Sequence, residues 1–378
     1  MKNTGVFLAA VALASALPSV ARADEPAPAE PQVTTDPYAA MPLVRQEDKH
    51  YLRAGLEVGG ILAVGLVDYM LNTTARGGTV RAGDTRWALR YDWELFRNKL
   101  TGTGINLDSN KFPTNYASHP YAGTMYFQAA RSNHLSFAES FLFSILGSTT
   151  WEYFGEIRET TSINDLIVTP VSGTAIGEAT MQLSAFFGRG RKNFGNGALS
   201  VLFSPVRAVN DSFDGSALVR SNDTDGLGFP REIWHRFEVS AGAGVTVQEN
   251  AGALHPRGVY FDQRVGLDLA LANLPGYAGA AHEAHLYDDG NVSNFKIDAT
   301  FSGGRAVDSL FMTRIVPIGY YVRDASPEGG SGALVGMRMS FEYGMHEWDR
   351  DGSRPVDVTC FVSPIGVAAE YVYGRGDL

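Results

Sequence analysis

The chain has 378 residues, of which 44% are hydrophobic and only 19% charged, and its formal net charge is −10. This acidic balance, with Lys and Arg scattered rather than gathered in a stripe, argues against nucleic acid as a partner. Because Cys360 is the only cysteine, an intramolecular disulfide is excluded and the folded state depends on packing.

The first 23 residues have the three parts of a secretory signal peptide. Lys2 supplies the positive start, an uncharged and mostly apolar run follows, and Ala21-Arg22-Ala23 is a small-x-small cleavage pattern. The apolar run is too short to span a bilayer, so we expect cleavage and export into a Gram-negative envelope. Residues 24–49 are rich in Pro and Ala and predict a linker, because this composition buries too little apolar surface to order itself.

Residues 50–195 have the pattern of a domain of five or six short helices. The predicted helices cover 51–71, 86–100, 121–131, 136–154, a segment from 162 that Pro170 interrupts, and 173–187. Ser136 and Glu139 have the capping-box spacing at the start of the fourth helix. The first helix has only ten uncharged residues at its centre, half of what a bilayer needs, so we interpret it as a buried core helix.

Residues 196–378 alternate between apolar and small or polar side chains. In 237–247 the odd positions are Phe, Val or Ala, whereas the even ones are Glu, Ser, Gly or Thr. The same alternation recurs in 261–271, 295–301, 333–345 and 365–373, with glycine-containing turns between most of these runs. Strands of about ten residues are longer than usual, and long strands with one apolar and one polar face are typical of outer-membrane barrels. We therefore predict an α+β protein: an N-terminal bundle of short helices followed by an antiparallel β-barrel of about eight or more long strands.

Periodicity alone does not separate this barrel from a soluble sandwich or a lipocalin-like barrel, because both need alternation. Strand length and the export signal favour the outer membrane, with membrane lipid as the contact; the periplasm is the alternative location. The chain ends with Gly374-Arg375-Gly376-Asp377-Leu378 and lacks the terminal aromatic residue usual in such barrels, which is also consistent with a truncated C-terminus.

Several motifs between residues 87 and 215 carry a resemblance to a known family. In chain order they are HPYAG from His119, AARSN from Ala129, WEYFGE from Trp151, SINDLIVTP from Ser162, the segment Gly173 to Glu178, and SPVRAVN from Ser204. Together they resemble DUF3943, a bacterial family of uncharacterised envelope proteins. The resemblance implies a fold region and an envelope setting but no activity. The order of a His, a later acid and an Asp-Leu pair is also faintly similar to VanZ-like helical envelope proteins.

Four ionisable residues of this region stand among largely uncharged neighbours: His119, Arg131, Glu152 and Asp165. Glu152 follows an uncharged run of eleven residues, so burial would raise its pKa unless a cation compensates. We expect Arg131, at the end of the preceding predicted helix, to be that cation. Asn164 and Asp165 follow a predicted N-cap at Ser162.

Two interpretations of these residues remain open. In the first, His119, Glu152 and Asp165 are catalytic acid–base groups, Arg131 and Asn164 pair with them or bind an anion, and the protein is an envelope enzyme acting on a lipid or cell-wall substrate. In the second, the residues form a buried network that fixes how the helices pack. We favour the second: a non-enzymatic outer-membrane protein whose helices plug, cap or dock on the barrel, with membrane lipid and another envelope protein as the expected partners. Since no histidines have i, i+4 spacing, we predict neither a metal nor a cofactor.

Overall fold

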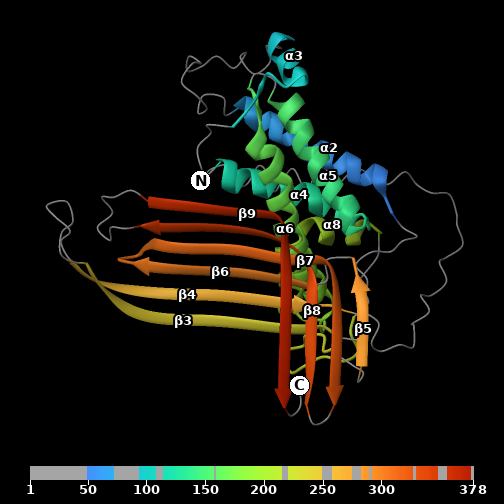
Figure 1. Cartoon of the computed structure of the whole chain (residues 1–378), viewed down its shortest axis with the longest axis vertical. Coiled ribbons are helices and arrows are strands. Elements are labelled where there is room, and N and C mark those ends of the chain that lie inside the picture. The colour runs from blue at the N-terminus through green and yellow to red at the C-terminus, as the bar shows by residue number, and fades with distance from the viewer. Residues whose placement is uncertain are drawn as a thin grey trace, which may run out of the picture.

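The computed structural model describes residues 49–71, 93–107, 114–156, 159–214, 220–248, 258–274, 282–288, 292–326, 329–347 and 356–375 (Figure 1). The predicted signal peptide, nearly all of the predicted linker and the last three residues lie outside these ranges.

Helices occupy the N-terminal part of the described chain. They are α2 (Tyr51–Leu71), α3 (Trp93–Thr101), α4 (His119–Ser132), α5 (Phe137–Thr150), α6 (Ile163–Arg189), α7 (Phe194–Phe203) and α8 (Pro205–Asp214), with π-helical turns η3 (Thr114–Ser118) and η4 (Trp151–Gly155). Two short strands, β1 (Ile105–Asn106) and β2 (Thr161–Ser162), pair in parallel. Ser136 and Glu139 form the predicted capping box of α5. No helix among the described residues has the length and apolarity that crossing a membrane requires.

Two predictions about the helices are wrong. Pro170 does not interrupt α6, which continues for 27 residues. Proline removes one backbone hydrogen bond, but α6 is buried from Val168 onward along nearly its whole length, and this packing maintains the helix. The helices also extend past the predicted boundary at residue 195, because α7 and α8 reach Asp214 and the first long strand begins at Trp234.

The C-terminal part forms one antiparallel sheet. Its strands are β3 (Trp234–Gln248), β4 (Gly258–Ala272), β5 (His282–Tyr287), β6 (Val292–Ser302), β7 (Arg305–Ser326), β8 (Gly329–Glu347) and β9 (Val356–Arg375). Their order is β3-β4-β6-β7-β8-β9, and β5 pairs with β7. The predicted α+β architecture, with the helices first, is confirmed. Among the described residues the sheet has seven strands and no pairing joins β3 to β9, so closure into a barrel of eight or more strands is not observed there.

Two long strands, β7 and β9, contain bulges with a proline. On β7, Val316 and Pro317 lie opposite one residue of β8, and on β9, Pro364 and Ile365 do the same. Proline has no N–H to donate, so a bulge is where a sheet tolerates it. β7 pairs with β6 before its bulge and with β5 after it. Figure 1 shows the result: β7, β8 and β9 turn from a part beside β3, β4 and β6 into a part beside β5.

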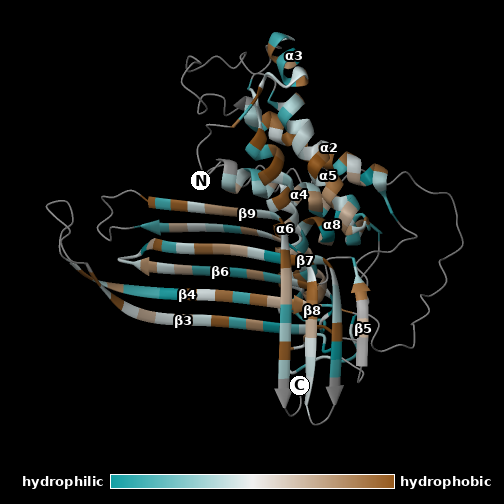
Figure 2. Cartoon of the chain, in the orientation of Figure 1, coloured by the Kyte–Doolittle hydropathy of each residue, from teal (hydrophilic) through white to brown (hydrophobic). Residues whose placement is uncertain are grey.

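The helix α6 joins the helices to the sheet. Its C-terminal residues Leu183, Phe186 and Phe187 pack in one buried cluster with side chains of β4 and β6, including Leu269 and Phe295. Farther toward its start, α6 shares a second cluster with α4, α5, β7 and β8. The apolar side chains of the sheet that lie near the helices are therefore covered by α6. Figure 2 shows apolar and polar residues alternating along the strands beyond this contact.

Candidate functional site

Two glycines bring the N-terminal ends of α4 and α6 together. A Cβ atom on Gly123 would lie 2.0 Å from the carbonyl oxygen of Thr169, and one on Gly173 would lie 2.3 Å from the carbonyl carbon of Gly123. Only hydrogen side chains permit this approach of two helix backbones. Ser144 Oγ on α5 donates to the carbonyl oxygen of Gly123 (3.2 Å) and ties the third helix to the crossing.

Three of the predicted residues converge beside this crossing. His119 is the first residue of α4, Asp165 lies in the first turn of α6, and Glu152 lies on η4. His119 Nε2 and Asp165 Oδ2 are 3.6 Å apart. One nitrogen or oxygen of each of the three side chains lies within 4.8 Å of the others. The residues are 8%, 1% and 0% exposed in the order His119, Glu152, Asp165. We call these three residues the His-Glu-Asp cluster.

Ser162 fixes two members of the His-Glu-Asp cluster. Its backbone N–H donates to Glu152 Oε2 (2.8 Å), and its Oγ accepts from the backbone N–H of Asp165 (3.0 Å) as the N-cap of α6. The same hydroxyl donates to Oδ1 of the half-buried Asn164 (3.0 Å), which places Asn164 at the edge of the cluster. Ser148 Oγ donates to the carbonyl oxygen of Asp165 (3.1 Å). Asp165 is therefore held by hydrogen bonds at both its backbone N–H and its backbone carbonyl oxygen.

Two further charged residues lie next to the cluster and were not predicted. The buried Lys99 ammonium donates to the backbone carbonyl oxygens of Glu152 and Glu156, the latter at 2.7 Å. Burial lowers the pKa of Lys99, and the charges of Glu152 and Glu156 oppose this effect. Trp151 Nε1 donates to Glu156 Oε1 (3.0 Å). The WEYFGE motif could have indicated Glu156, whereas Lys99 lies more than fifty residues away on a helix with no motif to mark it.

The predicted pairing of Arg131 with Glu152 is wrong. Arg131 donates from Nε to Glu178 Oε2 (2.9 Å), from Nη2 to Glu178 Oε1 (3.2 Å) and from Nη1 to the carbonyl oxygen of Leu135 (3.0 Å). Gln182 Nε2 also donates to Glu178 Oε1 (2.7 Å). Arg131 lies twelve residues after His119 on one helix, which separates them by about 18 Å along the axis. The arginine therefore forms a separate buried centre at the far end of α4.

A third buried centre surrounds Glu57 of α2. Its Oε2 accepts from Asn133 Nδ2 (2.9 Å) and Asn210 Nδ2 (3.2 Å), and its Oε1 lies 3.8 Å from Arg53 Nε. The two asparagines end the AARSN and SPVRAVN motifs. Burial raises the pKa of Glu57 to about 7, against the opposing effects of the amides and Arg53.

This raised pKa predicts a specific pH dependence of stability. The unfolded carboxyl titrates near 4.5, so the folded state holds its proton more tightly between pH 4.5 and about 7. The contribution of Glu57 to the free energy of unfolding is therefore fully present below pH 4.5 and is lost as the pH rises through about 7. Glutamine does not titrate, so we expect the free energy of unfolding of Glu57→Gln not to fall in this way. At pH 8 it should exceed that of the wild type by roughly 1–3 kcal/mol. Urea unfolding of both proteins at pH 5 and pH 8 measures it; an equal decline in the variant would contradict the assignment.

The fold and the site define a class of protein: a helical domain with buried polar centres that packs on a long-stranded antiparallel sheet. Residues 104–206 match the model of the family described as "Domain of unknown function (DUF3943)". The chain carries this domain, and the resemblance predicted from its motifs is confirmed. The match covers α4 to α7 and includes the whole His-Glu-Asp cluster. No curated protein and no solved structure matches the chain, and nothing in these comparisons supports the similarity to VanZ-like proteins.

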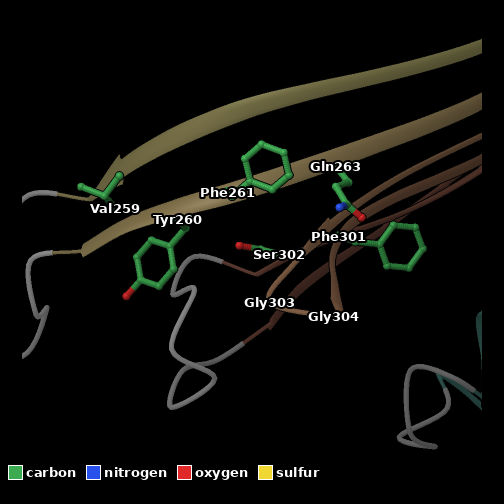
Figure 3. Close-up of a pocket in the computed structure, with 8 residues that line it drawn as sticks. All are labelled: Val259, Tyr260, Phe261, Gln263, Phe301, Ser302, Gly303 and Gly304. Atoms are coloured by element: carbon green, nitrogen blue, oxygen red, sulfur yellow. The ribbon is translucent and has the colours of Figure 1, made fainter.

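A surface pocket lies elsewhere in the described part of the molecule. It is lined by Val259 and Phe261 of β4, by Phe301 of β6 and by the turn at Gly303 and Gly304 (Figure 3). It shares no residue with the His-Glu-Asp cluster.

The His-Glu-Asp cluster offers one imidazole and two carboxylates, which can exchange a proton or bind a cation.

Proposed function

We propose that this protein is an outer-membrane protein whose sheet contacts lipid through one apolar face and whose helical domain is docked on that sheet. One observation carries the proposal: large apolar side chains are exposed along one face of long strands. On β3 and β4 they are Val239, Val245, Val247, Val259, Phe261 and Val265. The strand register places Val245 opposite Phe261 and Val247 opposite Val259, so these side chains form a continuous surface.

The same face stays apolar beyond the bend. Ile318, Tyr320, Val335 and Val367 are exposed there, and the register aligns Ile318 with Met337 and Val367 across three strands. Soluble monomers rarely expose contiguous apolar surfaces of this extent. Strands that cross an outer membrane expose such a face to lipid.

On β3, β4 and β6 the opposite face of the sheet is polar. Arg264 Nη2 and Lys296 Nζ each lie 3.3 Å from a carboxylate oxygen of Asp298, and Arg236 Nη2 lies 3.8 Å from Asp268 Oδ1. These residues alternate along each strand with the apolar residues of the other face. Outer-membrane barrels place such a polar face toward their interior. The division of charge and apolarity between the two faces therefore supports the proposal.

In this proposal the helical domain has a structural or binding role. Its polar centres are buried and hydrogen-bonded, which specifies one arrangement of the helices. Leu142 and Leu146, one turn apart on α5, are exposed and give the domain an apolar surface of its own for lipid or for another envelope protein.

Fractionation of cells followed by gel electrophoresis with and without boiling tests the location of the protein. We expect the protein in the outer membrane with a heat-dependent mobility; a soluble periplasmic protein without a shift would overturn the proposal.

A matched pair of substitutions tests which face meets lipid. Val239 and Ser240 are adjacent, exposed, and on opposite faces of β3. In water, Val239→Arg at an 81% exposed site changes stability by no more than about 0.5 kcal/mol. Against lipid the same change costs roughly 2–4 kcal/mol near the bilayer centre. We expect Val239→Arg, but not Ser240→Arg, to reduce the folded fraction in outer membranes, measured by the gel shift. Equal behaviour of the two variants would contradict a lipid-facing role.

A second candidate function is supported by the convergence of His119, Glu152 and Asp165. An imidazole beside two carboxylates is a set of groups that acid–base catalysis uses, so an envelope enzyme acting on a lipid or cell-wall substrate is the alternative. Glu152→Gln tests it. A folded variant that loses the phenotype of the wild-type gene supports catalysis, whereas a folded variant with full function removes the alternative.

A further inference from the structure

We propose that His119, Glu152 and Asp165 bind a divalent transition-metal ion, with Zn²⁺ as the ion that best fits the ligand set. One imidazole nitrogen and two carboxylate oxygens are ligands that Zn²⁺ accepts in proteins. The proposal rests on the His-Glu-Asp cluster alone and does not depend on the location of the protein.

The spacing of the cluster fits a coordination sphere. His119 Nε2 and Asp165 Oδ2 are 3.6 Å apart, which is too long for a hydrogen bond. Two ligand atoms that are each about 2.1 Å from a tetrahedral Zn²⁺ lie about 3.4 Å from one another. The three ligand atoms lie within 4.8 Å of one another, so an ion placed between them needs only small side-chain movements to reach all three.

The charge of the cluster also favours a cation. Glu152 and Asp165 place two carboxylates in a site that is almost completely buried. Charges of the same sign repel strongly in a region of low dielectric constant. A divalent cation between the carboxylates balances both charges. Lys99 adds one positive charge nearby, and its ammonium is hydrogen-bonded to two main-chain carbonyls of the segment that carries Glu152.

The ligands are held in place by a surrounding set of hydrogen bonds. Ser162 donates to one oxygen of Glu152, and Ser162 and Ser148 bind the backbone N–H and C=O of Asp165. Outer hydrogen bonds of this kind orient the ligands of known metal sites. Three protein ligands leave a fourth position for water, as in catalytic rather than structural zinc sites. The His119 side chain is 10% exposed and gives the site its contact with the surface.

Metal titration of the full chain, purified in detergent without a histidine tag and treated with a chelator, tests this site. We expect one equivalent of Zn²⁺ per chain, a higher melting temperature with bound metal, and the visible absorption of tetrahedral Co²⁺ on cobalt addition. His119→Ala and the isosteric Asp165→Asn should each weaken binding at least tenfold. His346→Ala is the matched control, because His346 and Asp308 form an exposed His–Asp pair on the sheet.

The wild-type titration is decisive by itself. A chain that takes up no stoichiometric Zn²⁺, Co²⁺ or Mn²⁺ overturns the proposal, whatever the variants do. The proposal also fails if folded His119→Ala and Asp165→Asn bind metal as tightly as the wild type and His346→Ala. Loss of binding in both cluster variants, with binding kept in His346→Ala, supports it.

Discussion

Glu178→Gln is expected to destabilise the protein by about 3–5 kcal/mol, because it leaves the guanidinium of Arg131 without its charge partner. The two side chains form a bidentate ion pair with no exposure to solvent. Water cannot replace the lost carboxylate at such a site, so the cost includes the desolvation of the arginine. Denaturant unfolding of the wild type and the variant measures the difference.

Two comparisons make this prediction specific. Asp214→Asn removes the partner of Arg53 from a pair whose side chains are both more than one-fifth exposed, and we expect it to cost about 1 kcal/mol or less. The double change Arg131→Met with Glu178→Leu removes both charges and should recover most of the loss. A cost below about 1 kcal/mol for Glu178→Gln would show that the buried pair does not stabilise the helices.

Gly123→Ala is expected to push α4 and α6 apart. The expected loss in the free energy of unfolding is about 3 kcal/mol or more, at the upper end of what overpacking of a core produces. The new methyl group would lie 2.0 Å from a backbone oxygen of Thr169, and neither helix backbone can yield without moving the other. Because the crossing also positions His119 beside Asp165, the variant should lose metal binding together with stability.

Gly59→Ala provides the control for this change. Gly59 lies inside α2, and a Cβ atom there would meet nothing within 4 Å. Alanine is preferred over glycine within helices by about 0.5–1 kcal/mol, so this variant should be slightly more stable. Thermal unfolding of both variants measures the contrast. If Gly123→Ala were as well tolerated as Gly59→Ala, the close approach of α4 and α6 would not limit the fold.

The sequence predicted the parts of the fold that depend on local pattern. The helix at 51–71 and the capping box at Ser136 follow from periodicity and spacing, which act within one turn or a few. Alternation in 237–247 predicted β3 for the same reason. The continuation of α6 through Pro170 depends on tertiary burial, which no local pattern records. Closure of the sheet depends on pairing between strands far apart in the chain and remains a prediction.

The candidate site was predictable in part. His119, Glu152 and Asp165 could be selected because each stands in a family motif among apolar neighbours, and the structure brings them together. The prediction that Arg131 pairs with Glu152 was wrong because it relied on the order of the predicted helices in the sequence. Arg131 lies at the opposite end of α4 from His119, where its partner is Glu178. Lys99 carried no local signal at all. Its place beside Glu152 arises only when α3 packs against η4, which is a long-range property.

The position of α6 has a consequence for how the molecule folds. The first half of α6 carries Asp165 and Gly173 into the helical domain, and its last turns insert Phe186 and Phe187 among the aromatic side chains of the sheet. Neither half of the chain can complete its core without this helix, although the helices precede the sheet in sequence. The two regions are therefore expected to behave as one cooperative unit, with α6 completed only when the last strands arrive.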